Sequence, residues 1–275
     1  MQLEEPNKWL AKVKVLDRIT KRPPDQVFDG NPKITKILTI DKYSTEEFGY
    51  PFLLRTPRQY VFFPTSESRL PSYIPWNKRD FDLVYSGTMF PEVIAILEKL
   101  NSLDLKLCVI SHSSSPLVTH RDVSYNQKLD LVARAKFSLV HNQLFLDKPH
   151  LASLLHRDSK IFQHGAFSHL TKEICHSGLI SNSGKRLRAP QLKSRLFEAS
   201  MVGSIPLVAE DRWRLADDWF ERDEHFIPFT EEQVIQSVER VMTDQRDYEA
   251  MGLDLQKFSR GNYTTRHFAS AYLMD

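Results

Sequence analysis

The chain lacks several features that would place it in a specialised class of protein. It has only 2 cysteines in 275 residues, Cys108 in an apolar segment and Cys175 in a polar one. We therefore expect no disulfide between them and a reducing compartment. No apolar run approaches the ~20 residues that a membrane-spanning helix needs, and the N-terminal residues lack the apolar core of a signal peptide. These absences predict a soluble, cytoplasmic protein.

A dominant charge and the common catalytic motifs are also missing. The formal net charge is +2, which argues against a nucleic-acid-binding surface. The ten histidines, among them His164, His169 and His176, follow no zinc-ligand spacing, so we expect no metal site. The absence of a Gly-x-Ser-x-Gly elbow disfavours a Ser/His/Asp hydrolase. The chemistry must therefore be sought in a local pattern.

Positive charge gathers in one short segment. Five cations lie there, at Lys185, Arg186, Arg188, Lys193 and Arg195. Such a cluster suits a small polyanion. A solvated basic loop and helix face is the alternative, and it stays open for this cluster taken alone.

The cluster leads into a helix and then a strand. Pro190 suits the first turn of a helix, because the N–H that proline lacks has no partner there. An apolar stripe follows at Leu192, Leu196, Phe197, Ala199 and Val202. Gly203 is expected to close the helix, and the apolar run 205–209 forms a short buried strand.

This helix carries cations at its start and a carboxylate further along. Lys193 and Arg195 fall in its first two turns, where free backbone N–H groups and the helix dipole favour an anion. Cations at this end of a helix are unfavourable by themselves, but a bound diphosphate would offset them, and Arg195 can grip two oxygens at once. Glu198 lies about one turn later and faces the same ligand.

The run from residue 193 to 209 resembles the donor-site signature of the GT-B glycosyltransferases. It reads Lys-Ser-Arg-Leu-Phe-Glu-Ala-Ser-Met-Val-Gly-Ser-Ile-Pro-Leu-Val-Ala. It is most similar to the group-1, spore-maturation-like transferases, with the fucosyltransferase-like enzymes as second choice. The resemblance implies that Glu198 binds the ribose hydroxyls and that Lys193 or Arg195 binds the diphosphate. The retaining branch usually has a second glutamate seven residues before the first, and this chain has Gln191 there.

The rest of the chain from residue 80 alternates strands and helices. Strands are expected near 82–86, 105–110, 137–141, 205–208 and 225–228, and helices after residue 91, at 126–136, at 215–220 and at 231–242. This spacing predicts an α/β, Rossmann-like parallel sheet with helices on both faces. The resemblance covers roughly residues 80–275, and the tail from Asn262 resembles the helix that crosses back to the other lobe.

Polar residues follow three of the expected strands. The turn Ser86-Gly87-Thr88 resembles the small-residue loop that lets the GT-B backbone approach the donor phosphates. His112 and Asn142 each follow a strand, at the carboxyl edge of the sheet where open α/β folds bind ligands. They are possible donor contacts, as is Gln191. An ordinary capped turn is the alternative for each of these loops.

The first 79 residues are less regular. A helical stripe covers 7–19, residues 34–40 alternate toward a strand, and prolines punctuate the stretch 49–76, as in an extended connection. We expect a partial N-terminal lobe and proline-rich linker at 1–79 and a nucleotide-sugar-binding domain at 80–275. About 80 residues cannot build a complete second Rossmann lobe beside an intact C-terminal one.

Two classes of function follow from these observations. The first is a metal-independent GT-B hexosyl- or deoxyhexosyltransferase, which uses no cofactor and transfers sugar from a nucleotide-diphosphate donor to a glycan or other acceptor. The second is a non-catalytic nucleotide-sugar-binding or interaction module that needs a partner lobe or subunit. No catalytic residue is assigned. The expected diphosphate-binding residues are Lys193, Arg195, Ser86, Gly87, Thr88 and Arg188.

Overall fold

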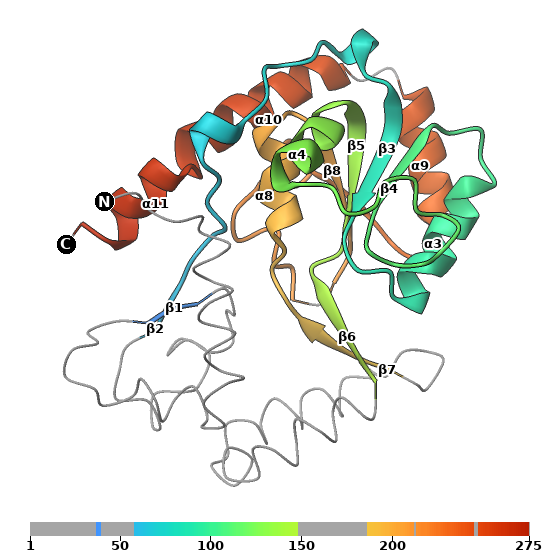
Figure 1. Ribbon diagram of the computed structural model, residues 1–275, viewed down its shortest axis with the longest axis horizontal. Coiled ribbons are helices and arrows are strands. Elements are labelled where there is room, and N and C mark those ends of the chain that lie inside the picture. Colours follow the sequence, from blue (N-terminus) through green and yellow to red (C-terminus); the bar gives the residue numbers. More distant parts are fainter. Residues whose placement is uncertain (1–36, 40–57, 148–185, 212, 245–246, 275) are drawn as a thin grey trace, which may run out of the picture. The chain divides into compact units, whose positions relative to one another are not determined.

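The computed structural model describes residues 37–39, 58–147, 186–211, 213–244 and 247–274 (Figure 1). The chain divides into two compact units, one made of Met1–Phe62 and Gln143–Leu192, the other of Phe63–Asn142 and Lys193–Asp275. The helix expected at 7–19, most of the linker, Lys185, Cys175 and the three histidines named above lie outside the described residues. The domain boundary at residues 79 and 80 stays a prediction.

The first unit contributes two small sheets. Strand β1 (Ile37–Thr39) pairs in parallel with β2 (Arg58–Tyr60) and falls inside the strand expected at 34–40. Strand β6 (Gln143–Asp147) pairs antiparallel with β7 (Arg186–Pro190). The prediction that Pro190 begins a helix was therefore wrong. Pro190 is the last residue of β7, which belongs to a two-stranded sheet and is therefore an edge strand, where a missing N–H is tolerated.

The second unit is built on a five-stranded sheet in the order β4-β3-β5-β8-β9. All neighbouring strands in this sheet are parallel. The predicted parallel, Rossmann-like sheet is thus confirmed. Its strands are β3 (Phe81–Ser86), β4 (Leu107–Ile110), β5 (Ala135–Val140), β8 (Ile205–Ala209) and β9 (Ile227–Phe229).

The strands are apolar because helices cover both faces of the sheet. All five residues of β8 are buried, and three consecutive residues of β3, Leu83, Val84 and Tyr85, are buried as well. Such continuous burial is typical of parallel sheets, whose crossover helices shield both faces. The helices are α3 (Pro91–Asn101), α4 (Tyr125–Ala133), α8 (Ser194–Met201), α9 (Val234–Thr243), α10 (Tyr248–Asn262) and α11 (Thr265–Tyr272).

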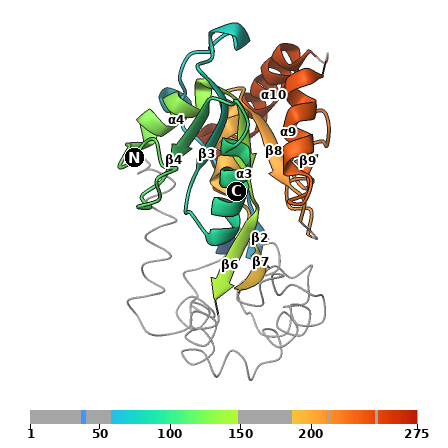
Figure 2. The ribbon, with the colours of Figure 1, turned by 90° about the vertical axis from the view of Figure 1, so that its right-hand side faces the viewer.

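Helices α4, α8 and α10 cover one face of the sheet, and α3 and α9 cover the other, as Figures 1 and 2 show. Helix α8 contacts both α4 and α10, which explains why six consecutive residues of α8, Leu196 to Met201, are buried. Among the described residues, no helix is long and apolar enough to cross a membrane.

The helix expected at 215–220 was a wrong prediction, because this stretch forms turns. The Asp211 carboxylate accepts a hydrogen bond from the Trp213 backbone N–H at 2.8 Å, a local bond that competes with helix formation. Arg214 then adopts a φ of 51°, which no α-helix contains. Conversely, the long helix α10 was not predicted from the sequence.

Gly203 ends α8 as the sequence predicted, with a left-handed φ of 73° just after the C-cap residue Val202. Its carbonyl oxygen is approached closely by α10. A Cβ placed on Gly252 of that helix would lie 2.9 Å from the Gly203 oxygen. Helix α10 can therefore pack at this distance only because residue 252 has no side chain.

Replacing Gly252 by alanine is therefore expected to destabilise the protein. An alanine in a helix interior usually gains about 0.8–1.0 kcal/mol over glycine, but overpacking against a backbone atom costs about 1–3 kcal/mol. The matched control is Gly261→Ala on the same helix, where a Cβ would meet nothing within 4 Å. Urea unfolding should show Gly252→Ala less stable and Gly261→Ala as stable as wild type or more so. Equal effects at the two positions would contradict the packing argument.

Candidate functional site

A cavity opens in the second unit where β3 and β4 end and α8 begins. Its volume is about 500 Å³, and its position at the carboxyl ends of parallel strands is the usual ligand position of open α/β sheets. Its lining comes from the loop after β3, the loop after β4, α4 and α8. The lining residues are Ser86, Gly87, Thr88, Met89, Ile110, Ser111, His112, Ser113, Asp122, Val123, Lys128, Ser194, Arg195 and Glu198.

The start of α8 faces this cavity. Lys193 is the N-cap residue, and no side chain caps the helix there. The backbone N–H of Lys193 donates instead to the Oδ1 atom of Asn142, at 3.1 Å. Ser194 and Arg195, in the first turn, line the cavity. A helix start of this kind favours an anion, because its backbone N–H groups and the helix dipole both point toward one.

The guanidinium group of Arg195 packs directly on Gly87. A Cβ placed on Gly87 would lie 2.3 Å from the Nη2 atom of Arg195. The guanidinium carbon also lies 5.0 Å from the centre of the Tyr85 ring, within the range of a cation–π contact. Gly87 has a φ of 149°, which an L side chain rarely adopts. The glycine thus makes room for the arginine at the strand end.

Glu198 is a buried carboxylate on the same helix. Its side chain is 3% exposed, and its Oε1 atom accepts a hydrogen bond from Lys128 Nζ of α4 at 2.7 Å. Its other oxygen, Oε2, is buried and has no hydrogen-bond partner among the described residues. Glu198 lies three residues after Arg195, hence on the neighbouring turn of one helix face. The cavity therefore presents a cation and a carboxylate about one turn apart.

Tyr125 backs this ion pair. The Nζ atom of Lys128 lies 4.6 Å from the centre of the Tyr125 ring. Burial, and next to it the negative charge of Glu198, raise the pKa of the Tyr125 hydroxyl. Tyr125 therefore stays a neutral phenol at physiological pH, and its ring stabilises the ammonium group of Lys128 by a cation–π contact.

A second, more exposed pair lies at the rim. His112 Nδ1 lies 2.9 Å from Asp122 Oδ1, with both side chains more than four-fifths exposed. Asp122 has a left-handed φ of 51°. Exposed pairs of this kind contribute little to stability, so the pair does not compare in strength with the buried Lys128–Glu198 contact.

Six of the residues expected from the sequence thus line one cavity: Ser86, Gly87, Thr88, His112, Arg195 and Glu198. Asn142 and Lys193 are not among the lining residues, but the hydrogen bond between them positions the start of α8. Arg188 and Gln191 belong to the first unit, and their roles stay predictions. Lys128 was not foreseen, because its partner Glu198 is 70 residues away along the chain.

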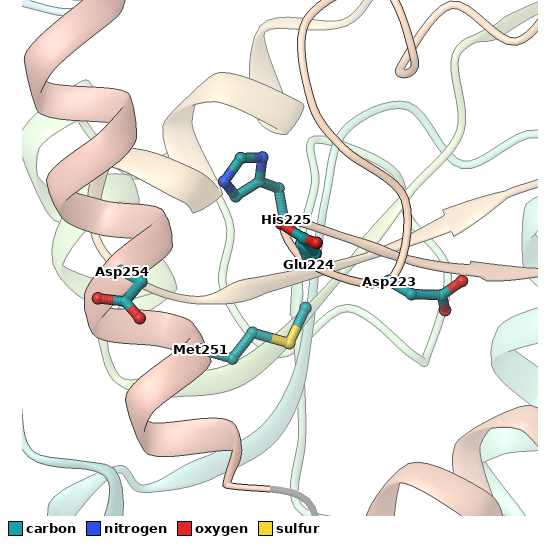
Figure 3. A pocket seen from close by; sticks show the side chains of 5 residues that line it. All are labelled: Asp223, Glu224, His225, Met251 and Asp254. Atoms are coloured by element: carbon teal, nitrogen blue, oxygen red, sulfur yellow. The ribbon is translucent and has the colours of Figure 1, made fainter.

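A second pocket, of about 350 Å³, has the opposite electrostatic character. Figure 3 shows Met251 projecting from α10 toward the loop that carries Asp223, Glu224 and His225, and Asp254 lies on the same helix. Three carboxylates line this pocket, so it repels a phosphate. The cavity beside Arg195 is therefore the better candidate for an anionic ligand.

Asp80 and Asp82 form an Asp-x-Asp spacing at the start of β3. Paired carboxylates of this kind are potential cation ligands. Asp80 pairs with Arg134 and Asp82 with Lys136, at 2.5 and 2.8 Å. Both carboxylates are thus already neutralised by side chains. Among the described residues, no group of three or more His, Cys, Asp or Glu side chains is arranged to hold a metal ion.

The parallel sheet, with a cavity between its strand ends and a helix start, defines a Rossmann-like α/β protein. A family model described as "Glycosyl transferase-like" matches residues 95–274. This is more than half of the chain, and the chain therefore belongs to the glycosyl transferase-like family.

No curated protein matches the sequence. Solved structures that resemble this chain include two proteins, HepE and SpnP. HepE (Alr3699) from Anabaena, solved with UDP and glucose, has 10% identity and a TM-score of 0.49, over 98% of this chain and 66% of that one. The spinosyn forosaminyltransferase SpnP has 12% identity and a TM-score of 0.38, over 87% of this chain and 54% of that one. The chain thus spans about two thirds and about half of these proteins.

Proposed function

We propose that this protein is a GT-B-type glycosyltransferase that transfers a sugar from a nucleotide-diphosphate donor to a glycan or other acceptor. The observation that carries the proposal is the arrangement of one helix face. The start of α8 and the guanidinium of Arg195 line the same cavity as the carboxylate of Glu198, about one helical turn away. A nucleoside diphosphate has the matching order of groups, two phosphates followed by the hydroxyls of a ribose.

In this mode the diphosphate lies against the start of α8. Arg195 donates to its oxygens, and the loop Ser86-Gly87-Thr88 allows a close approach. Glu198 accepts hydrogen bonds from the ribose hydroxyls through Oε2, the oxygen that has no hydrogen-bond partner in the part of the chain that the structure describes. His112, on the rim, is a possible further contact to the donor.

The same groups assist the reaction. The bond between the anomeric carbon and the phosphate oxygen breaks, its electron pair stays on the diphosphate, and the acceptor oxygen forms the new bond and loses its proton. Arg195 and the helix start stabilise the negative charge that develops on the leaving diphosphate. They take the place that a divalent ion has in metal-dependent transferases. We assign the acceptor site and the proton-accepting group to the other lobe.

Calorimetric titration tests this assignment. A thermal-shift panel of UDP-, GDP- and dTDP-sugars first selects the nucleotide. Glu198→Ala should then weaken the binding of both the nucleoside diphosphate and the nucleoside by about 1.5–3 kcal/mol, the range for a hydrogen bond to a charged group. Arg195→Ala should weaken the binding of the nucleoside diphosphate by a similar amount and leave the binding of the nucleoside unchanged. Equal affinities in all three proteins would reject the donor site.

Two additions to this titration test the chemistry. Adding EDTA should leave the affinity for the nucleoside diphosphate unchanged, since basic groups rather than a metal ion hold it. Release of free nucleoside diphosphate from the selected donor distinguishes an enzyme from a binding module, which shows affinity without turnover. Binding that disappears in EDTA would contradict the metal-independent mode.

A further inference from the structure

Lys128 contacts one oxygen of the Glu198 carboxylate, and among the described residues the other oxygen has no hydrogen-bond partner. Its Nζ atom lies 2.7 Å from Oε1, whereas Oε2 is buried and has no partner among the described residues. The Tyr125 side chain also interacts with this carboxylate, so two residues of α4 together hold it in one orientation and direct its second oxygen. This is the arrangement that a hydrogen-bond acceptor for a ligand requires.

The Lys128 side chain is itself restrained from two sides. It lies over the Tyr125 ring at 4.6 Å and against Glu198, and only 22% of it is exposed. Tyr125 and Lys128 are three residues apart on α4 and therefore share a face. A capping box fixes the start of this helix, since Ser124 and Gln127 each bond the backbone N–H of the other. The position of the ammonium is thus determined by a rigid element.

The charge balance supports the same role. A buried carboxylate without a nearby cation is strongly unfavourable, and Lys128 is the cation in contact with Glu198. We propose that Lys128 is a positioning residue, which orients the Glu198 carboxylate toward the ribose hydroxyls and thereby selects ribonucleotide donors. It acts through Glu198 and does not bind the phosphates. This inference rests on the proposed function of the cavity.

The test compares a ribonucleotide with its analogue that lacks both ribose hydroxyls. UDP and GDP are each titrated beside the matching 2′,3′-dideoxynucleoside diphosphate, and the pair whose ribonucleotide binds more tightly is kept. Wild-type protein should prefer the ribonucleotide roughly 10- to 100-fold, the equivalent of a hydrogen bond to a charged group. Both Lys128→Met and Glu198→Ala should lose most of this preference. The double variant should lose no more than either, because the two residues act as one unit.

Three controls separate positioning from other roles. Lys136→Met breaks a similar ion pair outside the cavity lining, in which Lys136 Nζ lies 2.8 Å from Asp82 Oδ1. This variant should retain the preference for the ribonucleotide. Inorganic pyrophosphate should bind Lys128→Met as tightly as wild type. If Lys128 contacted the phosphates directly, this substitution would weaken pyrophosphate binding. Lys128→Arg should restore part of the preference. If Lys128→Met does not fold, Lys128→Gln takes its place.

The outcomes are distinct. If a Lys128 variant keeps the full preference for the ribonucleotide over its dideoxy analogue, the positioning role is wrong and the donor site is unaffected. The same holds if the variant keeps this preference but binds pyrophosphate more weakly. Wild-type protein that does not distinguish the dideoxy analogue overturns the ribose contact of Glu198 and this inference with it. Wild-type protein that binds none of UDP, GDP and dTDP overturns the donor site itself.

Discussion

Phe197→Ala is expected to cost about 3–5 kcal/mol of stability, the range for removing a fully buried aromatic side chain. Phe197 is fully buried, and four other rings surround it. Their centres lie 5.2 to 6.4 Å from its own, at Tyr263, Phe220, Trp219 and Phe63. The aromatic cluster includes residues of α8, of the turns before β9 and of the segment after α10. The space left by Phe197→Ala therefore cannot close without moving several elements.

Urea unfolding measures this loss, and Phe197→Leu is the graded control. Leucine keeps much of the buried volume, so its loss should be clearly smaller than that of alanine. Loss of a single interaction of this size would remove a large fraction of the total stability of an ordinary domain. If alanine and leucine cost the same, or if alanine costs under about 1 kcal/mol, the cluster does not stabilise the unit as we infer.

Gly87→Ala is expected to weaken nucleoside diphosphate binding by about 1.5–3 kcal/mol, the contribution of a hydrogen bond to a charged group. The new Cβ would lie 2.3 Å from Nη2 of Arg195. Because the guanidinium is the end of a flexible side chain, it moves away and relieves the clash, but it then no longer occupies the position from which it meets the diphosphate. The loss should therefore appear mainly in affinity for phosphate-containing ligands. The φ of 149° at this position adds backbone strain, which lowers stability separately from affinity.

Titration with a nucleoside diphosphate and its nucleoside measures this effect. The diphosphate should lose affinity and the nucleoside should not. Gly261→Ala, where a Cβ meets nothing within 4 Å, is the matched control and should bind both ligands as wild type does. A Gly87→Ala, Arg195→Ala double variant should be no weaker than Arg195→Ala alone. Additive losses would show that Gly87 acts independently of Arg195.

Much of the fold could be predicted from residue 80 onward, because parallel strands and their crossover helices have strong local patterns. The apolar run of β8 and the helix before it are examples. The predictions failed where a few side chains decide the backbone. The Asp211 side chain bonds the Trp213 N–H and Arg214 turns left-handed, so 215–220 is not helical. Similarly, pairing with Gln143 makes Pro190 the end of a strand.

The segment from α8 through Gly203 to β8 could be predicted from local pattern, because apolar periodicity and the preference for glycine at a left-handed residue are local properties. The same pattern predicts a cation and a carboxylate one turn apart on that helix. Which other groups meet them depends on the tertiary structure. Gly87 lies under Arg195, and Lys128 holds Glu198, because the sheet order places the ends of β3 and the helix α4 next to α8. Contacts between residues so distant in sequence depend on the packing of whole elements, which no local pattern encodes.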